Sequence, residues 1–157
     1  MTSLTKNLVR GVIAGAAGTT ALNAVTYLDM AVRARPASST PQQTVERAAS
    51  LVGVSLPPDD EEKEAVESGL GSLLGILAGV GAGAVLGALR GLTGHPRSKL
   101  GTIGTAGALA MVAGNGPMTV LGVTDPRTWA RADWAADVVP HLAYAAAAGL
   151  TLEALAD

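Results

Sequence analysis

The sequence predicts an all-α fold, an integral membrane four-helix bundle with glycine-zipper packing and a short amphipathic connecting helix. The first observation behind this prediction is a set of long runs without charged residues. The runs cover 11–28, 68–89, 100–124 and 134–152. Only Asp137 and His141 interrupt the last of them. Because about 20 apolar residues cross a bilayer, each run is long enough for one span. A soluble Ala- and Gly-rich bundle is the alternative.

The second observation is a row of six glycines, each four residues from the next. They are Gly71, Gly75, Gly79, Gly83, Gly87 and Gly91. An interior Gly costs a water-soluble helix about 1 kcal/mol relative to Ala, whereas in a bilayer small residues let helices approach closely. Steps of four residues drift by about 40° around a helix, so the row cannot face one straight neighbour throughout. We expect a crossing helix or different partners at its two ends, and small residues in the first and third spans could supply them: Gly11, Gly15, Gly101, Gly104 and Gly107. Contact between copies of the chain is the alternative use of the row.

The third observation is composition. The chain has 157 residues, no Phe, no Cys and a formal net charge of −2. We expect a single membrane domain, 1–157, packed through small side chains. The near-neutral net charge is not that of a nucleic-acid-binding protein, which is typically basic. The absence of Cys excludes disulfides and thiolate metal sites. We expect no cofactor.

The first span is predicted at about 6–33. Lys6 and Arg10 before its uncharged run would also suit a signal peptide, but the second half of the run is polar and no clear cleavage pattern follows. We therefore interpret the segment as a retained span. Pro36 begins a polar connection, 36–65.

That connection contains a predicted short helix. Thr40, Pro41 and Gln43 have the form of an N-cap, a first-turn proline and a capping box, and Gly53 can end the helix. Its apolar residues fall on one face, so it either lies along the membrane surface or forms a solvated linker. The acids at 59–62 suit the first turn of the next helix better than a calcium site.

The second span is predicted at about 66–91 and is followed by a basic loop at 90–99, which indicates the cytoplasmic side. An even number of spans places both termini on that side. The cations Lys6 and Arg10 near the N-terminus fit a cytoplasmic position, although several other cations lie on the opposite side. We expect a multi-pass protein of the bacterial cytoplasmic (inner) membrane with cytoplasmic termini.

The third and fourth spans are predicted at about 98–122 and 133–155. Pro117 and Pro140 should kink or break them, because proline cannot donate to the carbonyl four residues earlier. Between them, Asp125 and Pro126 predict a capped turn, and the two tryptophans, Trp129 and Trp134, suit a membrane interface.

Polar residues at membrane depth are the candidate functional residues. Asp137, His141 and Tyr144 share one helical face, following Asp133 and preceding Ala148. The first span carries a second stripe, formed by Thr19, Asn23, Thr26 and Tyr27, and the third span contains Asn115. An ionisable group at the bilayer centre costs at least about 2.5 kcal/mol and usually faces a cavity or a partner.

A carboxylate one turn from an imidazole could serve a proton relay, and the alternative is that these residues tie helices together by hydrogen bonds. Two ligands are too few for a metal site. No nucleophile or oxyanion device accompanies the pair, so we expect no enzymatic activity.

The segment from Pro117 onward resembles the YagU-like family of bacterial inner-membrane proteins. The shared pattern comprises Pro117, a Gly-hydrophobic-Thr-x-Pro turn at 122–126, Trp134, Asp137 and the His141–Leu142 pair. The opening GVIAGAAG resembles that family's first span, and the Ala/Gly/Arg bias resembles actinobacterial proteins. The glycine-rich second span and the acidic connection depart from the pattern. The resemblance implies a membrane location and directs attention to Asp137 and His141. The family has no firmly assigned activity, and a link to acid tolerance is the main suggestion.

These observations favour a small membrane transport or proton/ion conduction module. Its pathway would be lined by Asp137, His141, Tyr144, Asn23 and Asn115. The alternative is a non-catalytic accessory or scaffold subunit of a larger membrane complex. The expected partners are the lipid bilayer and either further copies of the chain or other membrane proteins.

Overall fold

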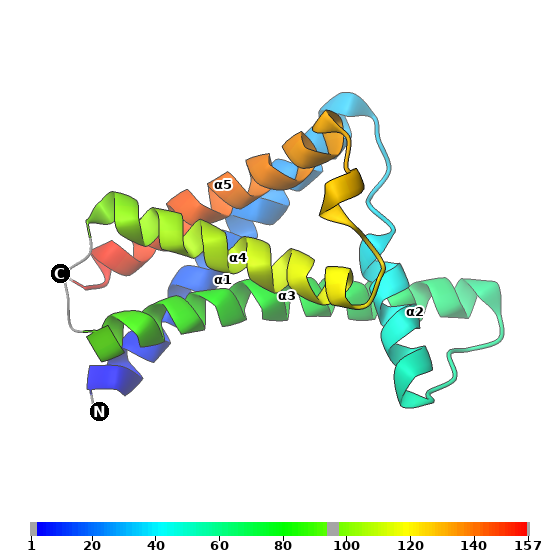
Figure 1. The fold of residues 1–157 in the computed structure, drawn as a ribbon, viewed down its shortest axis with the longest axis horizontal. Helices are drawn as coiled ribbons and strands as arrows, with labels where there is room; N and C mark the ends of the chain where they lie inside the picture. Colours follow the sequence, from blue (N-terminus) through cyan, green and yellow to red (C-terminus); the bar gives the residue numbers. More distant parts are fainter. Residues whose placement is uncertain (1–2, 94–97, 157) are drawn as a thin grey trace.

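Helices make up nearly all of the chain in the computed structural model, which describes residues 3–93 and 98–156 (Figure 1). They are α1 (Ser3–Arg33), α2 (Thr40–Val52), α3 (Asp60–Thr93), α4 (Lys99–Val120), the 3-10 helix η1 (Pro126–Thr128) and α5 (Arg131–Ala154). The described residues contain no strand. The predicted all-α class is confirmed, and the four long helices correspond to the four predicted spans.

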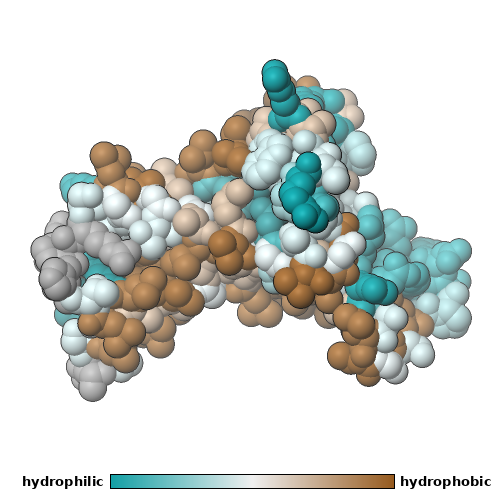
Figure 2. Space-filling model, viewed as in Figure 1, coloured by the Kyte–Doolittle hydropathy of each residue, from teal (hydrophilic) through white to brown (hydrophobic). Residues whose placement is uncertain are grey.

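Three helices of the described chain are long and apolar enough to cross a membrane: α1, α3 and α5. The predicted third span, α4, is 22 residues long, but glycines, threonines and Asn115 dilute its hydropathy. Large apolar side chains such as Leu73, Leu77 and Leu142 are exposed on the outside of the helices. Figure 2 shows hydrophobic residues over much of the bundle surface and hydrophilic residues gathered toward the end near α2.

The four long helices form a ring in which α1 packs against α3 and α5, and α4 packs against the same two helices. Leu4 at the start of α1 lies beside Gly91 at the end of α3, and the start of α4 and the end of α5 lie at the same end of the bundle (Figure 1). Part of the basic loop, residues 94–97, lies outside the described residues. The buried centre contains Ala14, Leu86 and Leu152.

The glycine row of α3 changes partner along its length. A methyl group added at Gly83 would lie 2.5 Å from the carbonyl oxygen of Gly11, and one added at Gly87 would lie 2.8 Å from the Cα of the same residue. Gly79 and Gly91 also face α1, whereas Gly71 faces Pro41 of α2. The remaining member of the row has no neighbour within 4 Å of an added methyl group. The row therefore serves mainly to bring the α1 and α3 backbones together.

Gly104 and Gly107 of α4 do not supply the second small surface that the sequence suggested for this row. Gly104 has no neighbour within 4 Å of an added methyl group, and one added at Gly107 would meet Ala145 of α5 at 3.0 Å. The reason is the ring arrangement, in which the Gly107 side of α4 is turned to α5.

The connecting helix α2 begins one residue earlier than its sequence pattern suggests. Ser39 occupies the N-cap position, and the Gln43 amide donates to its hydroxyl at 2.8 Å. Gly53 ends the helix with a positive φ of 73°, as predicted. Asp59 accepts hydrogen bonds from the backbone N–H groups of Glu61 and Glu62 at the start of α3, so these acids stabilise a helix start.

The two prolines do not break their helices. Pro117 lies in the last turn of α4, which continues to Val120, and Pro140 is buried within an uninterrupted α5. The expected break near mid-depth in α4 is wrong, because the helix ends only three residues after the proline and little of it remains to be redirected.

Replacing Gly83 with Ala should destabilise the bundle, because the added methyl group overlaps backbone atoms of α1. We expect a loss of about 1–3 kcal/mol, the usual range for overpacking, measured by denaturant titration in micelles. Gly75→Ala is the matched control, since its methyl group meets no atom within 4 Å. Equal stability of the two variants would contradict the close α1–α3 contact.

Candidate functional site

A carboxylate and an amide join α4 to α5. Asn115 Nδ2 donates to Asp137 Oδ2 at 3.0 Å, and both residues are half-buried. Asn115 stands on the last turns of α4 and Asp137 on the second turn of α5, so the two residues meet near the end of the bundle that carries η1. The sequence placed both residues in the candidate set but did not pair them.

His141 lies one turn further along α5 from this pair. Its Nδ1 is 2.7 Å from the backbone carbonyl oxygen of Asp137 and 3.6 Å from Oδ1 of the same residue. When Nδ1 carries the proton, it donates to that carbonyl and leaves Nε2 as the basic nitrogen. Nε2 points to α4, where a methyl group added at Gly114 would lie 3.5 Å from it. The backbone, more than the carboxylate, therefore orients the imidazole.

Tyr144 crosses the middle of the bundle. Its side chain is only 1% exposed, and its hydroxyl donates to the carbonyl oxygen of Gly79 on α3 at 2.7 Å. Gly18 of α1 lies against the ring, since a methyl group added there would be 2.7 Å from it. One side chain thus ties α5 to α3 and fills the space that a glycine of α1 leaves open.

The polar stripe of α1 is divided. Thr19 is buried, and its hydroxyl donates to the carbonyl of Gly15 in its own helix. Asn23 is half-buried, whereas Tyr27 is 62% exposed. Thr26 is half-buried as well, so the stripe runs from a buried residue to an exposed one along α1. Asn23 remains a candidate because it is half-buried.

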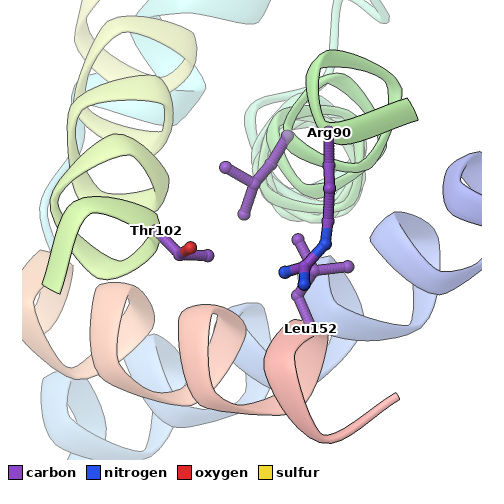
Figure 3. A pocket seen from close by; sticks show the side chains of 4 residues that line it. Arg90, Thr102 and Leu152 are labelled. Carbon is purple, nitrogen blue, oxygen red and sulfur yellow. The ribbon is translucent and has the colours of Figure 1, made fainter. Parts of the chain in front are cut away.

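A second polar cluster, which the sequence reasoning missed, joins three helix ends. Arg90 donates to Glu153 Oε1 at 2.6 Å, and the Thr102 hydroxyl donates to the same oxygen at 2.6 Å. Figure 3 shows the small cavity beside them, of about 10 Å³, with Arg90, Thr102 and Leu152 around it. That volume is near the minimum for one water molecule. The sequence carried a signal for this pair: Arg90 ends the second predicted span and Glu153 ends the fourth, and these two span ends lie on the same side.

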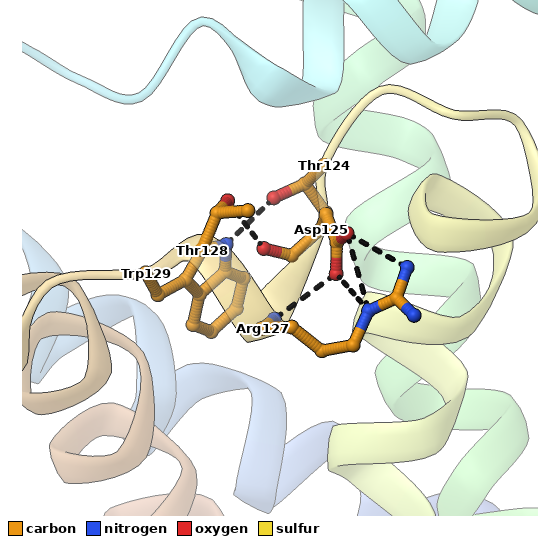
Figure 4. Close-up of polar contacts among 5 residues, drawn as sticks. All are labelled: Thr124, Asp125, Arg127, Thr128 and Trp129. Carbon is orange, nitrogen blue, oxygen red and sulfur yellow. Dashed lines mark hydrogen bonds and ion pairs between the residues drawn. The ribbon is translucent and has the colours of Figure 1, made fainter.

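The turn between α4 and α5 is held by local hydrogen bonds (Figure 4). Asp125 accepts from the backbone N–H of Arg127 and from its guanidinium. The side-chain bond from Arg127, followed by the backbone bond, holds the pKa of Asp125 below its usual value. Trp129 Nε1 donates to Thr124 Oγ1 at 2.8 Å, and its ring packs edge-on against Trp134.

Chemically, the α4–α5 cluster offers one carboxylate, one imidazole and one amide in contact between two helices. Such a set can hold or pass a proton. No group of three or more His, Cys, Asp or Glu side chains within the described ranges is placed to hold a metal ion. Comparisons with protein families, characterised proteins and solved structures give no match.

Replacing Asn115 with Ala should leave the half-buried Asp137 without its donor. We expect a loss of stability of about 1 kcal/mol and a similar coupling energy in a double-mutant cycle with Asp137→Ala, near the upper part of the range for polar contacts in membranes. Val112→Ala, at a position of the same helix that is 69% exposed, provides the comparison. If the stability losses of Asn115→Ala and Asp137→Ala simply add in the double variant, the hydrogen bond between the two residues is not formed.

Proposed function

We propose that the chain is a four-span protein of the bacterial cytoplasmic membrane, packed as a four-helix bundle through a glycine zipper, with cytoplasmic termini. We propose further that it carries protons or small ions. The contact of Asp137 with Asn115, beside His141, carries this proposal. Titratable groups placed between apolar helices are costly and usually mark a pathway or a functional site.

The route for a proton begins at this cluster and has to pass the apolar centre of the bundle. Leu86 and Leu152 are almost fully buried there. Beyond them lies the Arg90–Glu153 pair at the opposite end. Conduction therefore requires a second arrangement in which the apolar centre opens, as in transporters that expose one site to each side in turn. The resemblance to YagU-like proteins, for which acid tolerance is suggested, is part of this proposal.

Proton flux into proteoliposomes tests the proposal. Asp137→Asn keeps the shape of the side chain and removes its charge, so we expect it to abolish the flux without changing stability by more than about 1 kcal/mol. His141→Ala should also abolish it. Glu64→Gln, on an exposed part of α3 outside the cluster, is the matched control. Undiminished flux in folded Asp137→Asn, or no flux in the wild type, would overturn the proposal.

An accessory subunit of a membrane complex is the second candidate. The observation that favours it is the outward turn of several small residues of α3: methyl groups added at Gly69, Gly75 or Gly81 meet no atom within 4 Å. Another membrane helix could approach closely there. The glycines that face α1, such as Gly83, serve the fold of the chain itself.

Gly75→Leu should therefore weaken association with other membrane chains while the bundle stays folded. We expect at least a tenfold loss of a crosslinked complex, which corresponds to about 1.4 kcal/mol. The equivalent change at an open position of α4, Gly104→Leu, should retain the complex. Retention of the complex by both variants would remove the support for an accessory role at this surface.

A further inference from the structure

The helix α2 crosses α3 some turns after α3 begins, and its C-terminal half projects away from α3 (Figure 1). Pro41 contacts α3 at Gly71, where an added methyl group would lie 3.0 Å from the proline Cβ. Thr44 and Val45 are buried in the same contact, and Val45 is only 5% exposed. The first half of α2 is therefore fixed to the bundle by its apolar face.

The second half of that apolar face is left uncovered by the described residues. Val52 lies two turns after Val45 on the same side of the helix, yet it is 74% exposed. Leu51 and Val54 beside it are 63% and 58% exposed. Figure 2 shows the resulting hydrophobic end of α2 at the lower right. The opposite side of the helix is polar and comprises Gln43, Glu46, Arg47 and Ser50.

The position of α2 along α3 matches one boundary of a bilayer. The part of α3 from Gly71 to Arg90 is about 28 Å long at 1.5 Å per residue, close to the roughly 30 Å thickness of the hydrocarbon core. Arg90, paired with Glu153, stands at one limit of this length. The contact of α2 with Gly71 stands at the other, so α2 is placed where headgroups meet acyl chains.

Tryptophans mark the same boundary. The turn that follows α4 faces α2 across an open groove, which Leu121 and Val123 line from one side and Gln43 and Arg47 from the other. Trp129 is bonded to Thr124 directly after this turn and packs on Trp134. Indole side chains concentrate at membrane interfaces. The two tryptophans therefore indicate the same bilayer boundary as the length of α3.

We propose that α2 is an interfacial helix whose free apolar end, Leu51, Val52 and Val54, inserts between phospholipids at the headgroup–acyl boundary. Its polar side faces the headgroups and water. The inference rests on the proposal that the bundle spans a membrane, and it is independent of conduction. A lipid surface fits this patch better than a second copy of the chain, because three side chains fall far short of the roughly 800 Å² per partner of a stable protein interface.

Site-directed spin labelling tests the insertion directly, because the chain contains no Cys. The labelled variants are Val52→Cys, Ser50→Cys on the polar side of α2, and Leu150→Cys on the exposed surface of α5. Each is reconstituted in nanodiscs of phosphatidylethanolamine and phosphatidylglycerol. Collision with oxygen, which concentrates in lipid, is compared with collision with a water-soluble nickel chelate. We expect the oxygen-to-nickel ratio to exceed one at positions 52 and 150 and to fall below one at position 50.

The outcomes separate the two proposals. A ratio below one at position 52 with a ratio above one at position 150 would overturn the insertion of α2 and leave the membrane bundle standing. A ratio below one at position 150 would overturn the membrane bundle itself. Protection of position 52 from both reagents would show that protein covers the patch, which would also overturn insertion.

Discussion

The close approach of α1 and α3 determines where the other helices can lie. Gly11 and Gly15 of α1 meet Gly83 and Gly87 of α3 almost backbone to backbone. This closeness allows α5 to sit over both helices, so that Tyr144 lies on Gly18 and its hydroxyl reaches Gly79. In a bilayer, where water does not drive apolar surfaces together, such contacts supply the dispersion attraction that holds helices in place.

Polar contacts then secure the two ends of the bundle around an apolar centre. Asn115 and Asp137 join α4 to α5 at one end, and Arg90, Thr102 and Glu153 join three helices at the other. Groups of this kind are expensive to bury unless they are paired. Their pairing explains how the bundle accommodates them, and the titratable members at the first end provide the chemistry on which the proposed proton transfer depends.

The sequence was sufficient to predict the helices and most of their ends, because charge-free runs, Gly53, Asp59 and Asp125 mark them locally. It also predicted that the glycine row cannot face one straight neighbour throughout, because the drift of the row around the helix follows from its spacing alone. It could not predict that α4 faces α5, or that Arg90 meets Glu153, because those contacts depend on the order of helices around the ring. The break expected at Pro117 is absent for a related reason: the sequence shows the missing donor, but not that the helix ends three residues later.

The candidate site divides in the same way. The shared face of Asp137, His141 and Tyr144 follows from helical spacing, and the structure turns it inward. The partners of these residues, Asn115 and the carbonyl of Gly79, come from other helices and require the fold.

Solid-state NMR of glycine-labelled protein in lipid bilayers tests the α1–α3 contact most directly. We expect strong Cα cross-peaks between Gly15 and Gly83 and between Gly11 and Gly87, because these backbones touch within one chain. The cross-peaks should persist when labelled protein is diluted with unlabelled copies. Their absence, or their loss on dilution, would contradict the α1–α3 contact within one chain, since the glycine row would then either lack a close partner or join different copies of the chain.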